Sequence, residues 1–440
     1  MTMNRIDLFP ITTKIIHDQL NIAGHDLTQL AEQYGTPLYL YDQATLDAAT
    51  REYKSALASF YPSPASVTYA GKAFLCLAIA QWTQLHGLTV DCTGEGEIAI
   101  SAAAGVSKEN ILVHGVNKSK DDLNAAIIHA STIVVDNLSE LHRLKDLLTN
   151  TQSVCPNLWL RLLPGVSVTT HHAHTQTGHY ESKFGMTYEE IIEAAIFCKE
   201  NHLPLKGFHF HQGSNFRDPE PLLPAIDLAL DLAQEIGFTG DWHFCPGGGW
   251  GVAYHEDELP NPSVESYVRG ISEAVVEGCQ TRRLTLPHLH LEPGRSLVAR
   301  AGVALYRVGA IKRRGHKTWL LTDGGMADNP RYALYGAKYS CLTVSCPGGE
   351  RSERVSIAGP YCESGDIIIE DLPMPNVKEG DLIAIPVAGA YHLSMASNYN
   401  GARKPAVIWL ENGFVQLIQQ REVVQALMDT DSKLTVLNKL

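Results

Sequence analysis

From Ser66 to Arg295, short apolar runs alternate with longer amphipathic stretches of the length that helices need. In order, the apolar runs are VTYAGK, LTVDC, ILVHG, TIVVD, LWLRLL, LKGFHFH, WHFCPGGG and HLHLEPGR. A succession of strand-then-helix units predicts a parallel sheet, and about eight such units close into a TIM-like (β/α)8 barrel. A doubly wound open sheet is the alternative that the same alternation allows.

The pattern changes after Arg300. Strand-like segments such as VGAIKRR, KTWLLTDGG, ERVSIAG and PAVIWLENG then follow one another with turn residues between them. They predict a second, mainly antiparallel β domain. The β-prone run TPLYLYD precedes the barrel pattern, so we expect it to pair with that second domain. The expected division is an N-terminal segment that joins the β domain, a barrel, and a C-terminal β domain with dimer and substrate contacts, at 1–41, 42–300 and 301–440.

Composition narrows the class of protein. The chain has 440 residues, of which 45% are hydrophobic and 19% charged, as is typical of a soluble globular protein with more than one domain. A formal net charge of −13 argues against nucleic acid or a membrane surface as partner, because phosphate binding needs a basic face. The N-terminus has no basic segment followed by an apolar one, and no run approaches the length of a membrane span. We therefore expect a cytoplasmic protein that acts on small molecules.

The first apolar run ends in a lysine, Lys72, within VTYAGKAF. A lysine at the end of a buried strand places an amine where strand meets loop, and desolvation there favours the neutral form that attacks a carbonyl to make a Schiff base. A lysine that simply extends into solvent is the commoner reading of such a residue taken alone. The other strand ends must therefore decide between the two.

Reactive groups of a (β/α)8 barrel lie at the carboxyl ends of its strands. Taken singly, the polar residues at these strand ends have purely structural explanations. A glycine triplet can be a tight turn, and a histidine can be a hydrogen-bonded core residue. Together they supply an amine, a flat ring for stacking, backbone N–H groups with a hydroxyl for a phosphate, a carboxylate and a guanidinium. Those are the requirements of pyridoxal 5′-phosphate. The residues concerned are Lys72, Asp91, Glu97, His209, His211, Ser214, Gly247, Gly248, Gly249, Glu292, Gly294 and Arg295.

The chemistry of this cofactor suggests a role for several of them. A carboxylate beside the pyridine nitrogen keeps that nitrogen protonated and makes the ring an electron sink, and Glu292 is the candidate. His211 is expected against the ring face. Ser214 and the glycines at 247–249 are expected to hold the phosphate.

Several motifs resemble, in order, those of diaminopimelate decarboxylase: YAGKAF, HFHQGSN, PGGGWG, EPGRSLVAR, DGGMADNPRYALYGA, GPYCESGDII and VAGAYHLSMASNYNG. This family belongs to the alanine racemase and ornithine decarboxylase structural class, which joins a cofactor-binding barrel to a C-terminal β domain. The resemblance extends from about Leu38 to about Pro405. It implies decarboxylation of meso-2,6-diaminopimelate to L-lysine and carbon dioxide, the last step of lysine biosynthesis.

The resemblance also implies a homodimer in which each active site is shared. Cys362 of the partner chain would deliver a proton to the decarboxylated carbon, and Tyr391 would reach the cofactor near its phosphate. The substrate carries an amino acid group at each end, so a guanidinium for the distal carboxylate and an anion for the distal ammonium are needed, and Arg331 and Glu363 fit these tasks. The substrate-binding residues that the resemblance implies are Arg295, Arg331, Tyr335, Glu363 and Tyr391.

One segment departs from the family. Between Val168 and Phe184 the chain has VTTHHAHTQTGHYESKF where the family more usually has an HxYISTG-like sequence. The histidines at 171, 172 and 174 invite a metal site, but neighbouring side chains on one loop rarely converge on an ion without a ligand from elsewhere. We expect a lid over the substrate instead, and no metal site.

Two other activities and one non-catalytic role also fit parts of the sequence. A related decarboxylase of another basic or carrier-bound amino acid would differ only in the residues at the distal end of the substrate. A racemase of the same fold would need a second acid–base tyrosine on the β domain and would not need CESGD. A non-catalytic homologue that binds the cofactor would be expected to have lost Lys72 or Cys362, and both are present.

Overall fold

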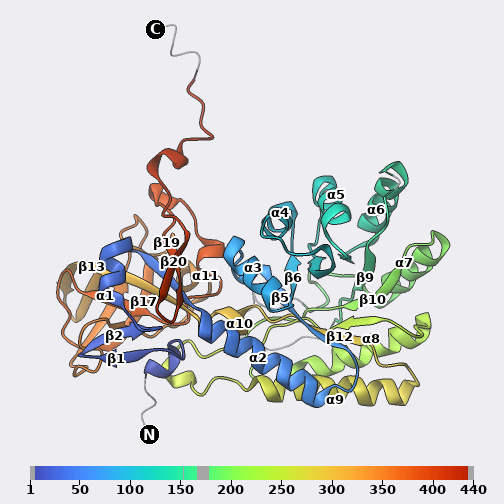
Figure 1. Ribbon diagram of the computed structural model, residues 1–440, viewed down its shortest axis with the longest axis horizontal. Coiled ribbons are helices and arrows are strands. Elements are labelled where there is room, and N and C mark those ends of the chain that lie inside the picture. Colours follow the sequence, from blue (N-terminus) through green and yellow to red (C-terminus); the bar gives the residue numbers. More distant parts are fainter. Residues whose placement is uncertain (1–4, 152, 166–177, 435–440) are drawn as a thin grey trace. The chain divides into compact units, whose positions relative to one another are not determined.

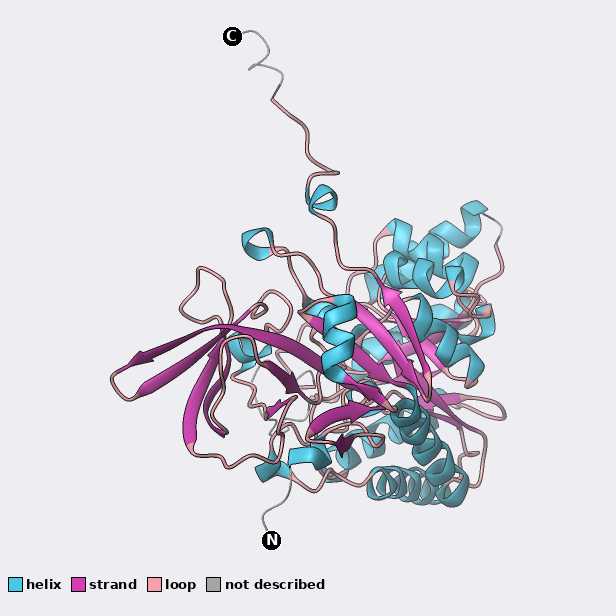
Figure 2. Ribbon diagram, turned by 60° about the vertical axis from the view of Figure 1, so that its left-hand side comes forward, coloured by secondary structure: helices cyan, strands magenta, loops and turns pink. Residues whose placement is uncertain are grey.

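The computed structural model of the 440-residue chain describes residues 5–151, 153–165 and 178–434. The chain divides into two compact units. One consists of Leu46–Ala253 and Glu258–Ala299, and the other of Met1–Thr45, Tyr254–Asp257 and Arg300–Leu440. We call them the barrel unit and the β unit. Colouring by secondary structure shows helices concentrated in the first and strands dominating the second (Figure 2).

The barrel unit contains a closed barrel of eight strands, every neighbouring pair of which is parallel. The barrel closes through the pairing of the eighth strand in sequence with the first, which excludes the open-sheet alternative. All eight predicted strands are present. They are β5 (Ala65–Ala70), β6 (Thr89–Cys92), β7 (Ile111–Val113), β8 (Thr132–Val135), β9 (Asn157–Arg161), β10 (Leu205–His209), β11 (His243–Cys245) and β12 (His288–Leu291).

Helices alternate with these strands and lie outside them (Figure 1). Their starts follow from local sequence: Ser119 with Asp122, and Thr187 with Glu190, form capping boxes that satisfy the first N–H groups of two helices. The helices are α2 (Gln43–Phe60), α3 (Leu77–Leu85), α4 (Glu95–Ala103), α5 (Lys120–His129), α6 (Leu138–Thr151), α7 (Tyr188–Glu200), α8 (Leu223–Ile236), α9 (Val264–Arg282) and α10 (Arg295–Val298).

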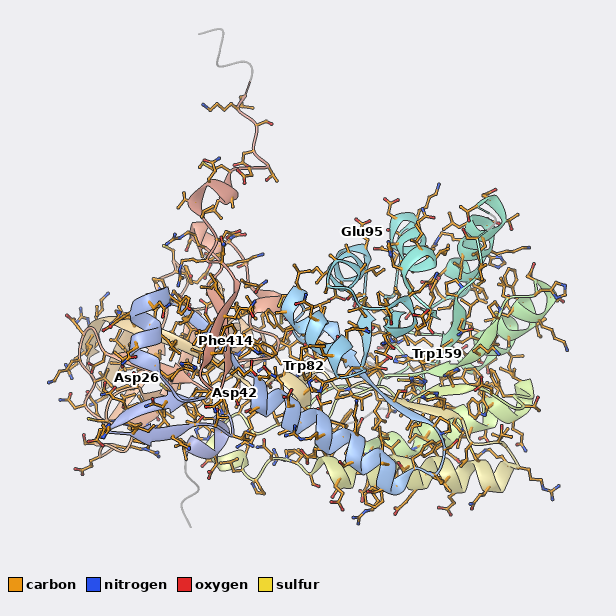
Figure 3. All side chains as sticks on the ribbon, in the orientation of Figure 1. Asp26, Asp42, Trp82, Glu95, Trp159 and Phe414 are labelled. Atoms are coloured by element: carbon orange, nitrogen blue, oxygen red, sulfur yellow. The ribbon has the colours of Figure 1, made fainter. Side chains whose placement is uncertain are left out.

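The barrel interior is filled rather than open. Leu112, Val134, Trp159 and Cys245, from four different strands, form one buried apolar cluster. Trp159, labelled in Figure 3, lies on β9, and its ring stacks on that of His243 on β11 at a centroid distance of 5.4 Å. Because β10 lies between these two strands, the contact crosses the inside of the barrel. This cluster, together with the ring of His243, fills the middle of the barrel interior between its two ends.

The β unit is built on a nine-stranded sheet, whose main path runs β17-β16-β14-β13-β4-β19-β20. Most of its pairs are antiparallel, which confirms the predicted fold class. The run TPLYLYD forms β4, which pairs with β13 and β19 in this sheet. The elements are β1 (Lys14–Ile16), β2 (Gln19–Ile22), β3 (His25–Asp26), α1 (Leu27–Tyr34), β4 (Leu38–Asp42), β13 (Gly302–Arg314), β14 (Lys317–Thr322), α11 (Arg331–Tyr335), β15 (Leu342–Thr343), β16 (Glu353–Ala358), β17 (Ile367–Met374), β18 (Leu382–Ile385), β19 (Ala406–Glu411) and β20 (Phe414–Gln419).

A short segment from the barrel's part of the sequence, Tyr254–Asp257, is grouped with the β unit. Arg5 explains its position, since this guanidinium is 1% exposed and forms an ion pair with Glu256 at 2.7 Å. Ser340 donates a hydrogen bond to the other oxygen of the same carboxylate. A buried guanidinium needs such a partner, and sequence periodicity gives no sign of this long-range pair.

The structure does not test two of the predictions, the lid over the substrate and the cytoplasmic location. The histidines at 171, 172 and 174 lie outside the described residues, so the expected lid stays a prediction. In the part of the chain that the structure describes, no helix combines the length and apolar character that crossing a membrane requires. The cytoplasmic location also stays a prediction.

Candidate active site

A buried carboxylate stands at the carboxyl end of the barrel. Glu292 follows the last residue of β12 and is 6% exposed. It accepts a hydrogen bond from His114 Nε2 at 2.9 Å and another from His209 Nε2 at 3.0 Å, and the two imidazole rings touch at a centroid distance of 4.1 Å. His114 follows β7 and His209 ends β10, so three separate strands meet at this carboxylate.

The environment keeps Glu292 ionised. Burial by itself would raise its pKa, but His209 and His114 outweigh that effect and hold the pKa well below the usual value. Asp91, which is also buried, has its pKa raised by burial and then by the charge of Glu292. The pKa values of the two carboxyl groups are therefore shifted in opposite directions, a pattern typical of sites that handle protons.

Lys72 lies just beyond the strand that was expected to end on it. β5 ends at Ala70, and Lys72 lies in a single 3-10 turn, Gly71–Ala73. Gly71 has no room for a side chain, because a Cβ there would come within 2.8 Å of the Asp91 carbonyl oxygen. The turn leaves the lysine exposed, so the desolvation expected from the apolar run is not found. The charge of Lys72 nevertheless acts on Asp91, Glu97 and His211, which puts its amine among these side chains.

The glycine triplet after β11 is required by geometry. Gly247 and Gly249 have φ values of +76° and +99°, which side chains rarely adopt. A Cβ on Gly248 would lie 1.8 Å from the carbonyl oxygen of Glu292. The Gly248 N–H donates to His211 Nδ1 at 3.3 Å, so the loop and this histidine are placed together. The triplet thus forms a tight cradle beside Glu292.

Arg295 opens the short helix α10 directly after Gly294 and is 7% exposed. Its Nη2 donates to Ser214 Oγ at 2.9 Å, which joins the loop after β10 to the one after β12. The structure therefore brings the barrel residues predicted from the sequence to one end of one barrel. Those residues are Lys72, Asp91, His211, Ser214, Gly247, Gly248, Gly249, Glu292, Gly294 and Arg295.

These groups fit pyridoxal 5′-phosphate. An ionised buried carboxylate suits a protonated pyridine nitrogen, the His211 imidazole offers a flat ring, and the glycine cradle is a surface that side chains cannot enter. The Ser214 hydroxyl and the Arg295 guanidinium are suited to an anion such as phosphate. The amine of Lys72 completes the set.

In the β unit, a chain of buried polar groups holds Arg331. This guanidinium is 7% exposed and lies 4.4 Å from the centroid of the Tyr254 ring, so it is not the surface arginine that its Asn-Pro turn would allow. It donates to the Tyr339 hydroxyl, which in turn lies 2.8 Å from His392 Nε2. Burial lowers the pKa of His392 well below its usual value. A neutral His392 can accept from Tyr339 and keep its proton on Nδ1.

The same chain of groups ends on Asp328. Tyr39 OH lies 3.2 Å from His392 Nδ1 and donates to Asp328 Oδ2 at 3.0 Å, and Tyr306 donates to the same oxygen. A continuous line of hydrogen bonds therefore runs from Arg331 to Asp328. Its members fix the direction in which the guanidinium points.

Replacement of Asp328 by asparagine is expected to change how stability depends on pH. Burial raises the pKa of Asp328 from 3.8 to about 6. The carboxyl group therefore stabilises the fold below about pH 4, and this contribution is lost as the pH rises through about 6. A difference of about 2 in pKa corresponds to about 3 kcal/mol. Urea unfolding at pH 4 to 7 should show Asp328→Asn gaining about that much relative to the native protein, and a constant difference would contradict the assignment.

The CESGD motif forms an exposed turn anchored by its last residue. Asp366 accepts hydrogen bonds from the backbone N–H groups of Met326 at 2.6 Å and Tyr361 at 2.8 Å. Cys362 and Glu363 are exposed, which rules out a buried thiol at Cys362 within the chain. The Tyr399 hydroxyl donates to Glu363 Oε1 at 3.0 Å. The turn thus presents a thiol and a carboxylate on the surface of this unit.

The remaining predicted site residues also lie in the β unit. Tyr335 ends α11, four residues after Arg331, and is half-buried. Tyr391 is half-buried as well and has a φ of 62°, a conformation that is uncommon for a residue with a side chain. Strain of this kind is often found at functional sites.

The sequence reasoning missed several members of the site. His114 was overlooked although it ends the ILVHG run, and the strand-end rule would have found it. His209 was seen at a strand end but was given no role. Tyr339 and His392 carry no such signal, because only the folded chain brings them to Arg331.

Comparison with known proteins agrees with this geometry. Residues 43–299 match the pyridoxal binding domain of the pyridoxal-dependent decarboxylases. The chain is 40% identical over 427 residues to the diaminopimelate decarboxylase of Bacillus subtilis, an alignment that covers 94% of this chain and 95% of that protein. It is 36% identical to the enzyme of the same name from Actinosynnema pretiosum, with 96% and 94% covered.

A solved structure gives the same result. The crystal structure of diaminopimelate decarboxylase from M. jannaschii superposes with a TM-score of 0.90 at 30% identity, and covers 97% of this chain and 99% of that one. The two cover each other almost completely, so the likeness includes both units and not the barrel alone. This chain belongs to the diaminopimelate decarboxylase family of pyridoxal-dependent decarboxylases.

Proposed function

We propose that this protein removes carbon dioxide from the D-configured centre of meso-2,6-diaminopimelate to give L-lysine, the last step of lysine biosynthesis. The observation that carries the proposal is the ionised, buried Glu292, held by two imidazole N–H groups at the carboxyl end of the barrel. Two relatives of the same family name support it, as does the M. jannaschii enzyme, which has also been solved in co-complex with L-lysine.

Pyridoxal 5′-phosphate, when bound, supplies an electron sink for the electron pair left behind by carbon dioxide. Lys72 would hold the cofactor through an amine suited to its aldehyde group. Glu292 holds a proton on the pyridine nitrogen, and His114 and His209 keep Glu292 ionised through their Nε2–H groups. The protein thereby keeps the pyridine nitrogen protonated, and loss of carbon dioxide depends on that positive charge.

The other barrel residues position the cofactor. His211 would offer its ring to the flat face of the cofactor, and Asp91 would contribute a polar group near it. Ser214, Arg295 and the glycines at 247–249, with Gly294, would hold the phosphate through hydroxyl, guanidinium and backbone N–H groups. Tyr391 of the β unit would add a hydroxyl near the same phosphate, as the family resemblance implies.

Recognition of the substrate's distal end falls to the β unit. In the proposal, the Arg331 guanidinium binds the distal carboxylate, in the direction that Tyr339 and His392 impose on it. Glu363 binds the distal ammonium group. Arg295, Tyr335 and Tyr391 complete the substrate contacts.

Replacement of Arg331 by lysine is expected to lower kcat/KM for meso-diaminopimelate by about 100-fold. Lysine keeps the charge but loses the planar fork that binds a carboxylate through two hydrogen bonds, and it leaves the Tyr339 hydroxyl without its donor. The change should fall mainly on KM. Steady-state kinetics of Arg331→Lys measure it, with Arg354→Lys, an exposed arginine paired with Asp371, as the matched control. A KM equal to that of the native protein would remove Arg331 from the distal site.

The proposal includes a homodimer in which Cys362 acts in the neighbouring subunit's site. Its support is that Cys362 and Glu363 lie on an exposed turn, available to a second copy of the chain. The Cys362 Sγ–H delivers a proton to the carbon from which carbon dioxide has left. Glu363 of the same turn then contacts the substrate beside it.

Mixing two inactive variants is expected to restore activity if the site is shared. A heterodimer of Lys72→Ala and Cys362→Ala chains contains one site with both native residues. Random exchange makes about half of the dimers mixed, so the mixture should recover about one quarter of native activity. Each variant mixed with itself should recover nothing. Failure of the mixture, with heterodimers demonstrated by differently sized tags, would contradict the shared site.

Carbon dioxide release from a panel of amino acids tests the function as a whole. The panel is meso-diaminopimelate, L-lysine, D-lysine, ornithine and arginine, each at the same concentration and with added cofactor. We expect release from meso-diaminopimelate with L-lysine as product, and little from the other four. Activity on those four alone would make the protein a decarboxylase of another basic amino acid and would overturn the substrate assignment.

A further inference from the structure

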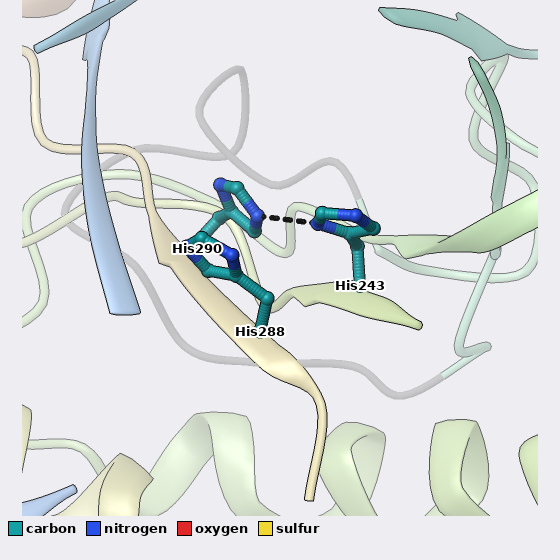
Figure 4. A group of neighbouring side chains, drawn as sticks. All are labelled: His243, His288 and His290. Carbon is teal, nitrogen blue, oxygen red and sulfur yellow. Dashed lines mark hydrogen bonds between the residues drawn. The ribbon is translucent and has the colours of Figure 1, made fainter. Parts of the chain in front are cut away.

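Three histidines lie together inside the barrel at the end opposite Glu292. His243 is the first residue of β11 and His288 the first of β12, and the two are register partners on these parallel strands. His290 lies two residues further along β12, so its side chain leaves the strand on the same side as that of His288. Figure 4 shows the three rings gathered between the two strands.

The spacing of the ring nitrogens suits one metal ion. A ligand nitrogen of each histidine lies within 4.8 Å of those of the other two. His243 Nδ1 and His290 Nε2 are closest, joined by a hydrogen bond of 2.9 Å (Figure 4). Two nitrogens that bind one zinc ion at about 2.0–2.1 Å with tetrahedral geometry stand about 3.3 Å apart. This pair would have to open by only a few tenths of an ångström, and the His288 nitrogen, within 4.8 Å of both, would have to move closer.

Stacking alone does not account for the cluster. The ring centroids of His288 and His290 are 4.3 Å apart with an angle of 20° between the planes, and the Trp159 ring lies 4.7 Å from that of His290. Apolar rings would stack as well without the cost of burying ring nitrogens. His290 is 8% exposed, and among the described residues its Nδ1 has no hydrogen-bond partner. His288 Nε2 lies 2.7 Å from Ser66 Oγ, so the buried nitrogen for which neither packing nor hydrogen bonding accounts is His290 Nδ1.

The residue types of the cluster match the ligands that zinc prefers. Imidazole nitrogens and a carboxylate are ligands that zinc accepts, and Asp241 precedes His243 by two residues.

We propose that His243, His288 and His290 bind one transition-metal dication, with zinc the best match, at the amino-terminal end of the barrel. The ion replaces the hydrogen bond between His243 and His290, and the proton of that bond moves to the other nitrogen of its own ring, so no proton is lost overall. Water or Asp241 supplies the fourth ligand. His288 precedes Glu292 by four residues, about 13 Å along the strand, so the site ties β11 to β12 and takes no part in the reaction.

Zinc binding to the holoenzyme tests the proposal, because bound cofactor occupies the side chains around Glu292. We expect native protein to retain one zinc ion per chain after gel filtration, measured by elemental analysis. Titration against a chromophoric chelator should show affinity falling about 100-fold or more in His290→Ala and His243→Ala, since loss of even an outer hydrogen-bonding partner of a ligand costs about 10- to 100-fold. His129→Ala, on the exposed end of α5, should bind like the native protein.

A second control separates this site from the other histidine-rich segment. The triple variant His171→Gln, His172→Gln and His174→Gln should retain zinc, whereas loss of zinc in this variant would assign the site to that segment and overturn the proposal. X-ray absorption at the zinc edge of the native protein should show three imidazole ligands, a result that does not depend on how any variant folds. No zinc in the native protein, no change in His290→Ala, or a sulfur ligand at the zinc would each overturn the proposal.

Discussion

Replacing Lys72 by alanine is expected to lower kcat for carbon dioxide release by at least about 10⁴-fold, because the amine that binds the cofactor covalently is lost. The position is specific. The 3-10 turn after β5 puts this amine among Asp91, Glu97 and His211, at the end of the barrel that carries Glu292. A free amine from solution has neither this placement nor the orientation that goes with it.

Two further variants make the test of Lys72 specific. Lys72→Arg keeps a positive charge beside Asp91 but cannot supply a nucleophilic amine, so it should be as inactive as Lys72→Ala. Lys120→Ala, at the exposed start of α5, should have native kcat. If Lys72→Ala retained a tenth of native activity, the lysine would not be the cofactor's covalent partner.

Replacing Glu292 by glutamine is expected to lower kcat by about 10²- to 10³-fold. Glutamine has nearly the same shape but no charge, so it cannot hold a proton on the pyridine nitrogen. Its amide oxygen can accept from only one side, and its NH₂ group would then face an imidazole N–H that now donates to the carboxylate. The cofactor ring then becomes a weaker electron sink, although the side chain keeps nearly the same shape.

The two effects of the Glu292 change can be measured separately. Cofactor content should stay near one per chain in Glu292→Gln, because the lysine and the phosphate contacts are unchanged, while kcat falls. Glu95→Gln, at the exposed start of α4, provides the control for removal of an acidic group (Figure 3). Native kcat in Glu292→Gln would mean that another group protonates the ring.

Much of the fold follows from local sequence. The eight barrel strands and the β unit were predictable because apolar periodicity and turn residues are properties of short segments. Lys72 and Glu292 were predictable for a related reason, since each follows an apolar run and a barrel places its reactive groups at strand ends. The glycine triplet after β11 was predicted as a phosphate-binding loop, and the structure adds that Gly248 has no room for a side chain.

Other features depend on contacts between distant segments. The histidines that bind Glu292 come from 83 and 178 residues earlier in the chain, and no periodicity links them to it. The same is true of the hydrogen bond between Tyr39 and His392, 353 residues apart, and of the His243–His290 pair, 47 residues apart. Barrel register and sheet pairing create these neighbours, so only the folded chain reveals them.

The exposure of Lys72 was not predicted, because a sequence pattern does not fix the exact residue at which a strand ends. An apolar run predicts a buried strand, but it does not predict where the strand stops. β5 ends two residues before the lysine, and the turn that follows carries the side chain out of the apolar layer. Strand ends are set by local packing, here by the contact of Gly71 with the Asp91 backbone.

Borohydride reduction of the holoenzyme tests the central claim most directly. Reduction fixes the cofactor to the amine that holds it, and mass spectrometry of the peptides then identifies the residue. We expect a single pyridoxyl group on the peptide that contains Lys72, and none when excess meso-diaminopimelate is added before the reductant. A label on another lysine, or no label on a protein that still releases carbon dioxide from meso-diaminopimelate, would contradict the account.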